Sequence, residues 1–136
     1  MAGYSGTPLV KKLGIKRGSK ILPWRAPQDY VNLVGPLPEG AAVVSRVTDN
    51  TDIVHIFCTK KSQLTKSLRS LRSRLRQDGT IWVSWPKKSA KVPTEITEDT
   101  VREIAIPLGF VDIKVCAVDD VWSGLKLVIR RENRTP

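Results

Sequence analysis

The stretch from Asp52 to Trp85 reads DIVHIFCTKKSQLTKSLRSLRSRLRQDGTIWVSW, and its pattern decides the fold. Its first part, Asp52–Cys58, is nearly all apolar, which is typical of a strand covered on both faces. A helix is predicted over Ser62–Arg76, because leucines recur along one face of it, at Leu64, Leu68, Leu71 and Leu75. An Asp-Gly pair ends this helix, and Thr80–Trp85 follows as a second strand. Strand, helix and strand in this order predict two parallel strands joined by a right-handed crossover.

Elements on both sides of this stretch extend the alternation of strands and helices. Further strands are predicted at Lys20–Trp24, Ala41–Arg46, Val111–Val118 and Leu125–Arg130. Helices are predicted at Pro8–Leu13, capped by Thr7, and at Thr97–Leu108. The turn Asp119–Gly124 joins the last two strands as an antiparallel pair. We therefore expect residues 1–136 to form one α/β domain, a compact Rossmann-like and mostly parallel sheet with helices on its faces and a C-terminal antiparallel hairpin.

Length and composition fit a single globular domain. The chain has 136 residues, of which 40% are hydrophobic, and it lacks the run of about 18 uncharged apolar residues that crosses a membrane. The N-terminus has no apolar signal-peptide core. Cys58 and Cys116 both lie in apolar strands, as reduced core thiols do. These features favour a cytoplasmic protein that does not bind membranes.

Positive charge is concentrated in two parts of the chain. The 23 lysines and arginines exceed the 13 acids by ten, with +6 over residues 1–25 and +9 over residues 60–91. Residues 92–129 carry −4. A polarised charge of this kind attracts anions, although a solvated face explains it equally well.

Four segments of the chain have distinctive sequences. They are Gly3–Leu9 (GYSGTPL), Pro36–Gly40 (PLPEG), Trp82–Lys88 (WVSWPKK) and Trp122–Arg130 (WSGLKLVIR). They are similar to a bacterial family known as domain of unknown function 3052. The order of elements also resembles the Rossmann-like methyltransferase fold in reduced form. The resemblance implies that fold, and the family brings no established activity with it.

The resemblance to methyltransferases raises the question of a cofactor. Such enzymes need a glycine-rich turn after the first strand, and they usually carry an acid at the end of the second. Here the first strand continues into WRAPQD, where a proline-rich, weakly helical link begins that has no glycine before Gly35. The second strand ends in Ser45 and Arg46, where an acid would be needed. We therefore expect no S-adenosylmethionine site and no other cofactor.

Other catalytic arrangements are weakly represented. His55, the only histidine, lies in the middle of a strand and is expected to be buried and structural. Cys58 lies three positions further on, so the two side chains would point to opposite faces. One histidine and two distant cysteines do not make an ordinary zinc site. The pair Asp119 and Asp120 fits a turn better than acid–base catalysis.

Basic residues follow four of the predicted parallel strands, at the point where each strand ends. They are Arg25, Arg46, Lys60, Lys61, Lys87 and Lys88, with Trp85 and Trp24 beside them. The carboxyl ends of parallel strands share one edge of a sheet, and open α/β folds bind ligands there, so we expect one basic rim with an aromatic wall. Such a rim suits phosphate-bearing ligands or a nucleic-acid backbone. The alternative is that these are ordinary loop lysines without a function.

The predicted helix offers a second basic surface. Arg69, Arg72 and Arg76 are spaced as one row, with Lys66 and Arg74 on the other flank. No acid within the helix pairs with them. Such a row would track phosphates or dock an acidic partner, and the alternative is that arginine stems cover the apolar seam.

Two functions from different classes remain. In the first, the chain is a non-catalytic binding module whose basic surfaces bind an anionic small molecule, nucleic acid or an acidic protein. In the second, it is a small enzyme that acts on a phosphorylated or carboxylated substrate, with an atypical cofactor turn at Trp24–Asp29. Pairing with a second copy of the chain cannot be separated from the first function by sequence. We favour the binding module.

Overall fold

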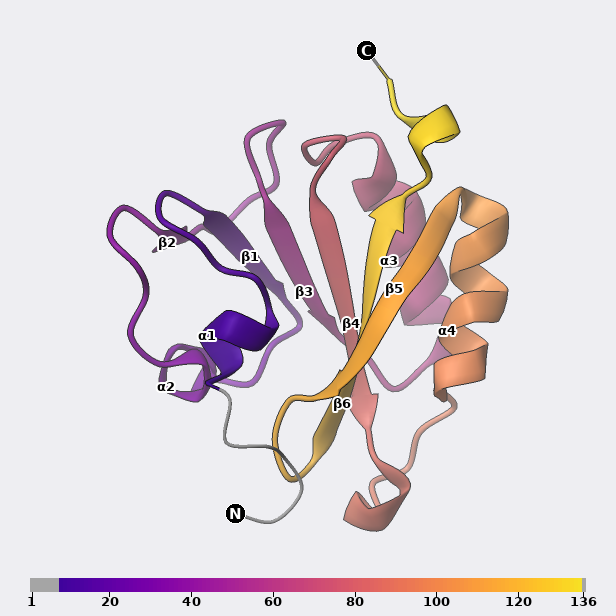
Figure 1. The fold of residues 1–136 in the computed structure, drawn as a ribbon. Coiled ribbons are helices and arrows are strands. Elements are labelled where there is room, and N and C mark those ends of the chain that lie inside the picture. The colour runs from indigo at the N-terminus through magenta and orange to yellow at the C-terminus, as the bar shows by residue number, and fades with distance from the viewer. Residues whose placement is uncertain (1–7, 136) are drawn as a thin grey trace.

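The chain forms one mixed six-stranded sheet (Figure 1). A computed structural model describes residues 8–135. The strands are β1 Lys20–Trp24, β2 Ala42–Val43, β3 Ile53–Phe57, β4 Thr80–Pro86, β5 Phe110–Ala117 and β6 Trp122–Ile129. Their order across the sheet is β2-β1-β3-β4-β6-β5, with β1 to β4 parallel and β6 antiparallel to both of its neighbours. The predicted Rossmann-like sheet with its C-terminal hairpin is confirmed.

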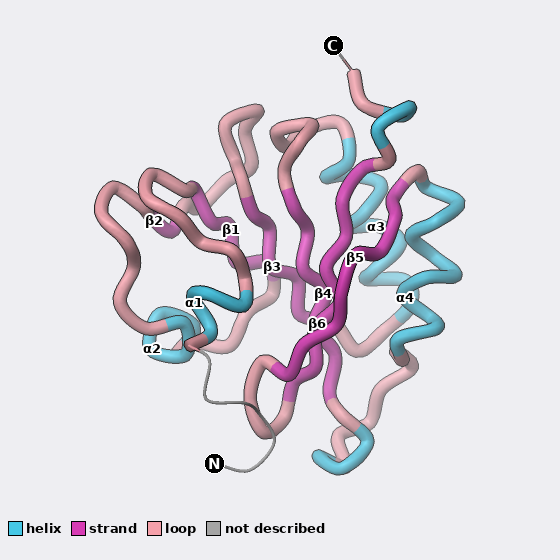
Figure 2. Tube along the Cα trace, in the orientation of Figure 1, coloured by secondary structure: helices cyan, strands magenta, loops and turns pink. Residues whose placement is uncertain are grey.

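Helices pack on both faces of this sheet and produce three layers (Figure 2). One face carries two short helices, α1 Leu9–Lys12 and α2 Tyr30–Val34. The other carries α3 Lys61–Arg72 and α4 Glu98–Ala105, which lie side by side. Side chains alternate along each strand, so neighbouring strand residues supply two separate apolar cores.

The leucine stripe of α3 is buried as predicted, but the helix is shorter than expected. Leu64, Leu68 and Leu71 are fully buried. The helix ends at Arg72 and not at Arg76, because the Arg72 carbonyl accepts a hydrogen bond from Gln77 Nε2 at 3.0 Å. The Arg76 amide bonds outside the helix as well, to the Thr51 carbonyl at 3.3 Å.

The ends of two strands also differ from their predicted positions. β2 has two residues instead of the predicted Ala41–Arg46, because the chain leaves the sheet to bury Val47 in the core beneath α3. β6 begins at Trp122 and not at Leu125. Its early start follows from Asp119, whose Oδ1 accepts the amide protons of Val121 and Trp122 at 2.8 and 2.7 Å and closes the turn tightly.

The caps and irregular turns largely match expectation. Thr97 caps α4, since its Oγ1 accepts from the Thr100 amide at 3.2 Å. The predicted helix Thr97–Leu108 finishes as a 3₁₀ turn, Ile106–Leu108, which contains Pro107. Thr7, expected as the cap of the first helix, lies outside the described residues.

The strand β5 forms one edge of the sheet and is irregular. Its pairing with β6 shifts by a bulge between Asp112 and Lys114. Ile113, the residue at the bulge, is 52% exposed, and Val115 is 49% exposed. The other edge strand, β2, has only two residues. Both edges of the sheet are therefore short or distorted.

Candidate functional site

The loops that follow β1, β3 and β4 lie at one edge of the sheet, at the bottom of Figure 1. β1 pairs with β2 on one side and with β3 on the other, so the direction of winding reverses between β1 and β3. In open α/β sheets, ligands bind beyond the carboxyl ends of the strands at such a reversal. This edge is therefore the first candidate site, and we call it the carboxyl edge.

Arg25 lies at the reversal point, directly after β1. Its backbone is left-handed, with φ of 59°, which is uncommon for a residue that carries a side chain. Its exposed side chain lines a depression together with Lys66 and Arg69 on one face of α3. Burial raises the pKa of the nearby Cys58 thiol to about 12, and the charge of Arg25 opposes that rise. Three basic side chains therefore flank one depression, and the buried Cys58 is no nucleophile at neutral pH.

Lys60 and Lys61 lie at the start of α3, and both are exposed. The amino end of a helix carries a partial positive charge, so lysines there are electrostatically unfavourable unless an anion lies close by. Glu95 supplies one carboxylate, whose Oε1 accepts the Lys61 amide proton at 2.8 Å. A single carboxylate therefore faces two lysines and a helix amino terminus.

Lys87 and Lys88 follow β4 and line a second depression beside the first turn of α4. Lys88 begins a 3₁₀ turn, Lys88–Ala90. The next residue, Lys91, has a left-handed backbone with φ of 55°. Among the described residues, Arg25 and Lys91 are the only non-glycine residues with positive φ, and both are basic residues of carboxyl-edge loops.

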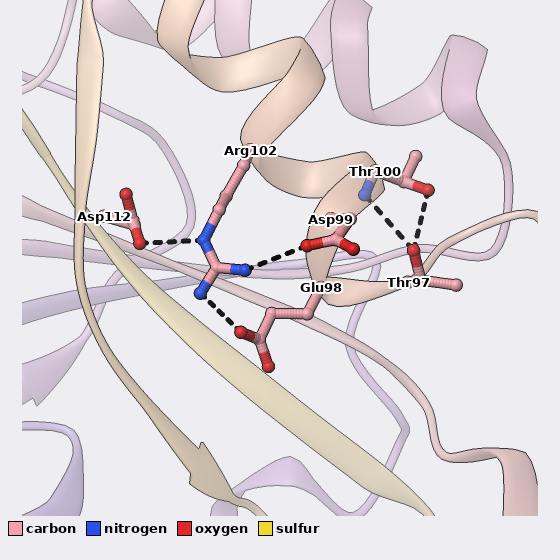
Figure 3. A network of polar contacts seen from close by, with 6 residues as sticks. All are labelled: Thr97, Glu98, Asp99, Thr100, Arg102 and Asp112. Carbon is pink, nitrogen blue, oxygen red and sulfur yellow. Dashed lines mark hydrogen bonds and ion pairs between the residues drawn. The ribbon is translucent and has the colours of Figure 1, made fainter.

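Acidic side chains line this second depression too, and one arginine forms ion pairs with them (Figure 3). Arg102 bonds to Asp112 at 2.9 Å, to Asp99 at 3.2 Å, and also to Glu98. Hydrogen bonding by Arg102 lowers the pKa of Asp112, and the carboxylates raise the pKa of Arg102. The network joins α4 to β5. Its three carboxylates exceed the single guanidinium, so negative charge remains beside Lys88.

The expected aromatic wall is wrong, because the tryptophan rings belong to the core. Trp85 is 7% exposed and packs in the apolar core beneath α3 and α4. Trp24 is half-buried against the same core, and its Nε1 donates to Ser67 Oγ at 3.0 Å. Stacking on bases needs an exposed ring face, which these side chains do not offer.

Arg46 is separated from the other bases of the predicted rim. It lines a different depression with Lys20, Asn50 and Thr51, which lie near the amino ends of β1 and β3. The reason is the short β2, after which the chain turns back along the sheet. Arg25, Lys60, Lys61, Lys87 and Lys88 remain at the carboxyl edge.

The arginine row predicted on the helix is broken up. Arg69 is exposed and belongs to the depression with Arg25. Arg72 is half-buried against Gly109, and its Nη2 donates to the Asn133 carbonyl at 3.4 Å. Arg76 lies beyond the helix and forms ion pairs with Asp78 at 2.6 Å and Asp52 at 3.3 Å. Two of the three arginines therefore have structural contacts.

His55 is buried and structural, as predicted. Its Nδ1 lies 2.9 Å from Tyr30 Oη, and its Nε2 lies 2.7 Å from Ser84 Oγ. Burial lowers the pKa of His55 to about 3 and raises that of Tyr30. Ser84 is fully buried as well. The Ser–His pair therefore has no access for a substrate in this conformation.

Two contributors to the carboxyl edge were missed by sequence reasoning. Lys91 and Glu95 lie in the loop after β4, beyond the positions next to the strand end. The signal for Lys91 was the basic loop itself, in which Lys87, Lys88 and Lys91 follow each other closely. No sequence pattern indicated that Glu95 would reach the amino end of α3.

The turn after β1 does not fit S-adenosylmethionine. Close approach of a ligand to this turn requires glycine, whereas Arg25 occupies the left-handed position and Pro27 removes an amide donor. Beyond β2, the chain offers Ser45 and Arg46 where an acid would hold the ribose hydroxyls.

The layered fold and the position of the reversal define a class, the Rossmann-like methyltransferase folds. Solved structures agree. A SAM-dependent methyltransferase from Aquifex aeolicus has a TM-score of 0.66 at 16% identity, covering 90% of this chain and 88% of that one. A putative type 11 methyltransferase from Sulfolobus solfataricus has a TM-score of 0.61 at 11% identity, covering 94% of this chain and 93% of that one. Methanococcus jannaschii fibrillarin, a pre-rRNA processing protein, has a TM-score of 0.59 at 13% identity, covering 93% of this chain and 70% of that one. At these identities the similarity shows the fold alone.

Within this class, the chain belongs to the DUF3052 family of proteins of unknown function, whose sequence pattern matches residues 39–131. No protein of curated function matches the sequence. Among residues 8–135, no group of three or more histidine, cysteine or acidic side chains is placed to hold a metal ion. None of the helices in this part of the chain is long and apolar enough to cross a membrane.

Proposed function

We propose that the chain is a non-catalytic module that binds the phosphate backbone of nucleic acid along its carboxyl edge. The observation that carries the proposal is the gathering of basic residues from the loops after three parallel strands and from α3, near the reversal point of the sheet. The residues are Arg25, Lys60, Lys61, Lys66, Arg69, Lys88 and Lys91. Phosphate contacts by lysine and arginine position a protein on nucleic acid without reading its sequence.

Backbone strain supports the same edge. Arg25 and Lys91 hold left-handed conformations that cost free energy, and residues of this kind cluster at functional sites. The two residues flank the edge from the loops after β1 and β4.

RNA is the first probe because it is a polyanion and because the names of two proteins of similar fold mention RNA. Fibrillarin is described as a pre-rRNA processing protein, and another protein of similar fold as a tRNA methyltransferase from B. subtilis. Those activities belong to those proteins, and here they only select the polyanion to test first. The buried tryptophans favour backbone contacts over base stacking, so little sequence preference is expected.

The test is the salt dependence of RNA binding, measured by anisotropy of a short labelled single-stranded RNA between about 50 and 200 mM KCl. The variant Lys60→Gln/Lys61→Gln/Lys88→Gln removes three charges from the carboxyl edge. Each lost phosphate contact lowers the log–log slope by about 0.7, so the slope is expected to fall by about 2.

A matched control removes the same charge elsewhere. Arg74→Gln/Arg130→Gln/Arg131→Gln changes exposed residues near the opposite edge and should keep the slope. Equal weakening by both triple variants would mean that binding follows net charge and not this edge. Salt-insensitive binding of one small molecule, without RNA binding, would support the enzyme alternative.

A further inference from the structure

A second cluster of lysines lies far from the carboxyl edge, on the face of the sheet that carries α1. Lys126 on β6 is directly opposite Lys114 on β5 and Trp82 on β4. Side chains of directly paired residues share one face. Trp82 Nε1 donates to the Leu13 carbonyl at 3.1 Å, which places this face beneath the end of α1. Lys16 comes from the loop between α1 and β1.

Two of these lysines lie at a depression of about 440 Å³ at the amino ends of β1, β3 and β4, and Lys114 adjoins it through its pairing with Lys126. Lys16 and Lys126 line it, together with Ser19, Thr80 and the ion-paired Arg76. The two acids in its wall, Asp52 and Asp78, are both bound to Arg76, at 3.3 and 2.6 Å. The four basic side chains of the lining, Lys16, Arg17, Arg76 and Lys126, outnumber these two acids, so the depression keeps an excess of two positive charges.

The lysine cluster has no structural explanation in the folded chain. Like charges directly opposite each other on a sheet are destabilising, and Lys126 is also half-buried. Among residues 8–135, Lys16, Lys114 and Lys126 form no ion pair. Burial, followed by the charges of Lys114 and Lys16, lowers the pKa of Lys126. An arrangement that costs stability at a depression is typical of a binding site.

We propose that Lys16, Lys114 and Lys126 bind the phosphate groups of a small soluble molecule at this depression. Lysine binds phosphate as a compact point charge, and three lysines favour a group with several negative charges, such as a diphosphate. The site lies at the amino ends of the parallel strands, opposite the carboxyl edge. It is therefore independent of the nucleic-acid function proposed above.

The experiment measures thermal unfolding and calorimetric binding with inorganic pyrophosphate as the probe. Pyrophosphate should raise the Tm of the natural chain by mass action. Lys126→Met keeps the length and apolar stem of the side chain but removes its charge. It should weaken pyrophosphate binding about tenfold or more, since hydrogen bonds to charged groups are the strong ones. It should also unfold at a higher Tm than the natural chain without pyrophosphate, because a repulsion is relieved.

Two controls separate this site from general charge effects. Arg131→Gln removes one exposed positive charge outside both proposed sites and should leave pyrophosphate binding unchanged. Sodium chloride at matched ionic strength should raise the Tm by less than pyrophosphate does. Lys114→Gln, at an exposed position, serves as a second variant if Lys126→Met folds poorly.

Several outcomes would overturn the proposal. One is unchanged pyrophosphate affinity in both lysine variants. Another is equal weakening by Arg131→Gln, and a third is an equal Tm rise with sodium chloride at matched ionic strength. If pyrophosphate does not bind and Lys126→Met weakens RNA binding, the lysines belong to the nucleic-acid surface, and the proposal of a small-ligand site is wrong. Loss of RNA binding in the carboxyl-edge variant with pyrophosphate binding intact would support both sites separately.

Discussion

At the scale of single residues, the buried chain Tyr30–His55–Ser84 links polar groups inside the core beneath α1 and α2. His55 also stacks on Phe57, with ring centroids 4.3 Å apart, and meets the Tyr30 ring edge-on at 5.4 Å. Both imidazole nitrogens have partners at 2.7 and 2.9 Å, so the neutral ring is fully satisfied. A proton added to this ring would place a charge in the apolar core, where no acid is bonded to it.

This arrangement predicts that the protein loses stability in mild acid. The folded pKa of His55 is about 3, below its ordinary value of 6.5, so the unfolded chain binds the proton more readily. The stability is complete above pH 6.5 and is lost as the pH falls toward 3, by about 2 kcal/mol at pH 5. Urea unfolding at pH 7.5 and pH 5 measures the difference in the free energy of unfolding. His55→Gln should flatten this difference, and an unchanged difference would assign it to carboxylates instead.

At the scale of elements, the helices and strands lie where the sequence predicts them, but several of them begin or end at other residues than predicted. The leucine stripe of α3 and the apolar run of β3 determine a local period, so the sequence alone predicts them. The end of α3 depends on Gln77 reaching back to the Arg72 carbonyl, and the start of β6 depends on the Asp119 side chain. Such contacts follow from three-dimensional neighbours and leave no periodic signal.

The candidate site was predictable to the same extent. Parallel strands placed Lys60, Lys61, Lys87 and Lys88 at one edge, because topology alone fixes where strand ends lie. The predicted position of Arg46 was wrong, since a two-residue strand cannot carry the chain to that edge. The predicted exposure of Trp85 was wrong because both faces of β4 are buried. The residue types of a strand do not show whether one face or both are covered. The lysine cluster on β5 and β6 required the strand register, which shifts at a bulge.

The helix α4 depends on its cap, and this gives a prediction at the same scale. Thr97→Ala removes the acceptor for the Thr100 amide and should lower the free energy of unfolding by about 1 kcal/mol. Thr97→Ser keeps a hydroxyl and should stay close to the natural chain. Denaturant unfolding of both variants measures the effect. Equal losses in the two variants would mean that the threonine methyl group, and not the cap, stabilises α4.

At the scale of the whole molecule, positive charge is distributed over two opposite edges of the sheet. The net charge is +10, with the carboxyl edge and the lysine cluster as separate concentrations. The acids Glu98 and Asp99 of α4 lie beside Lys88 at the carboxyl edge and pair with Arg102. Without a bound anion, the folded chain therefore carries uncompensated repulsion.

This charge distribution predicts that salt stabilises the protein in the absence of ligands. The Tm should rise with sodium chloride, since the Debye length shortens from about 30 Å at 0.01 M to about 3 Å at 1 M. Lys60→Gln/Lys61→Gln/Lys88→Gln should have a higher Tm than the natural chain at low salt. The difference should vanish near 1 M, and thermal scans over a salt series measure it. A Tm that falls with salt would show that attractive ion pairs dominate.

The bulge in β5 has a consequence for how copies of the chain behave at high concentration. An edge strand with free amide and carbonyl groups can recruit another strand and start aggregation. β5 has eight residues and carries the exposed apolar Ile113 and Val115, so a regular β5 would be an open template. The bulge twists this edge out of register, and Lys114 beside it adds a charge that repels an identical strand. We expect a variant that lacks Ile113 to have a regular β5 and to assemble as its concentration rises, which light scattering would detect.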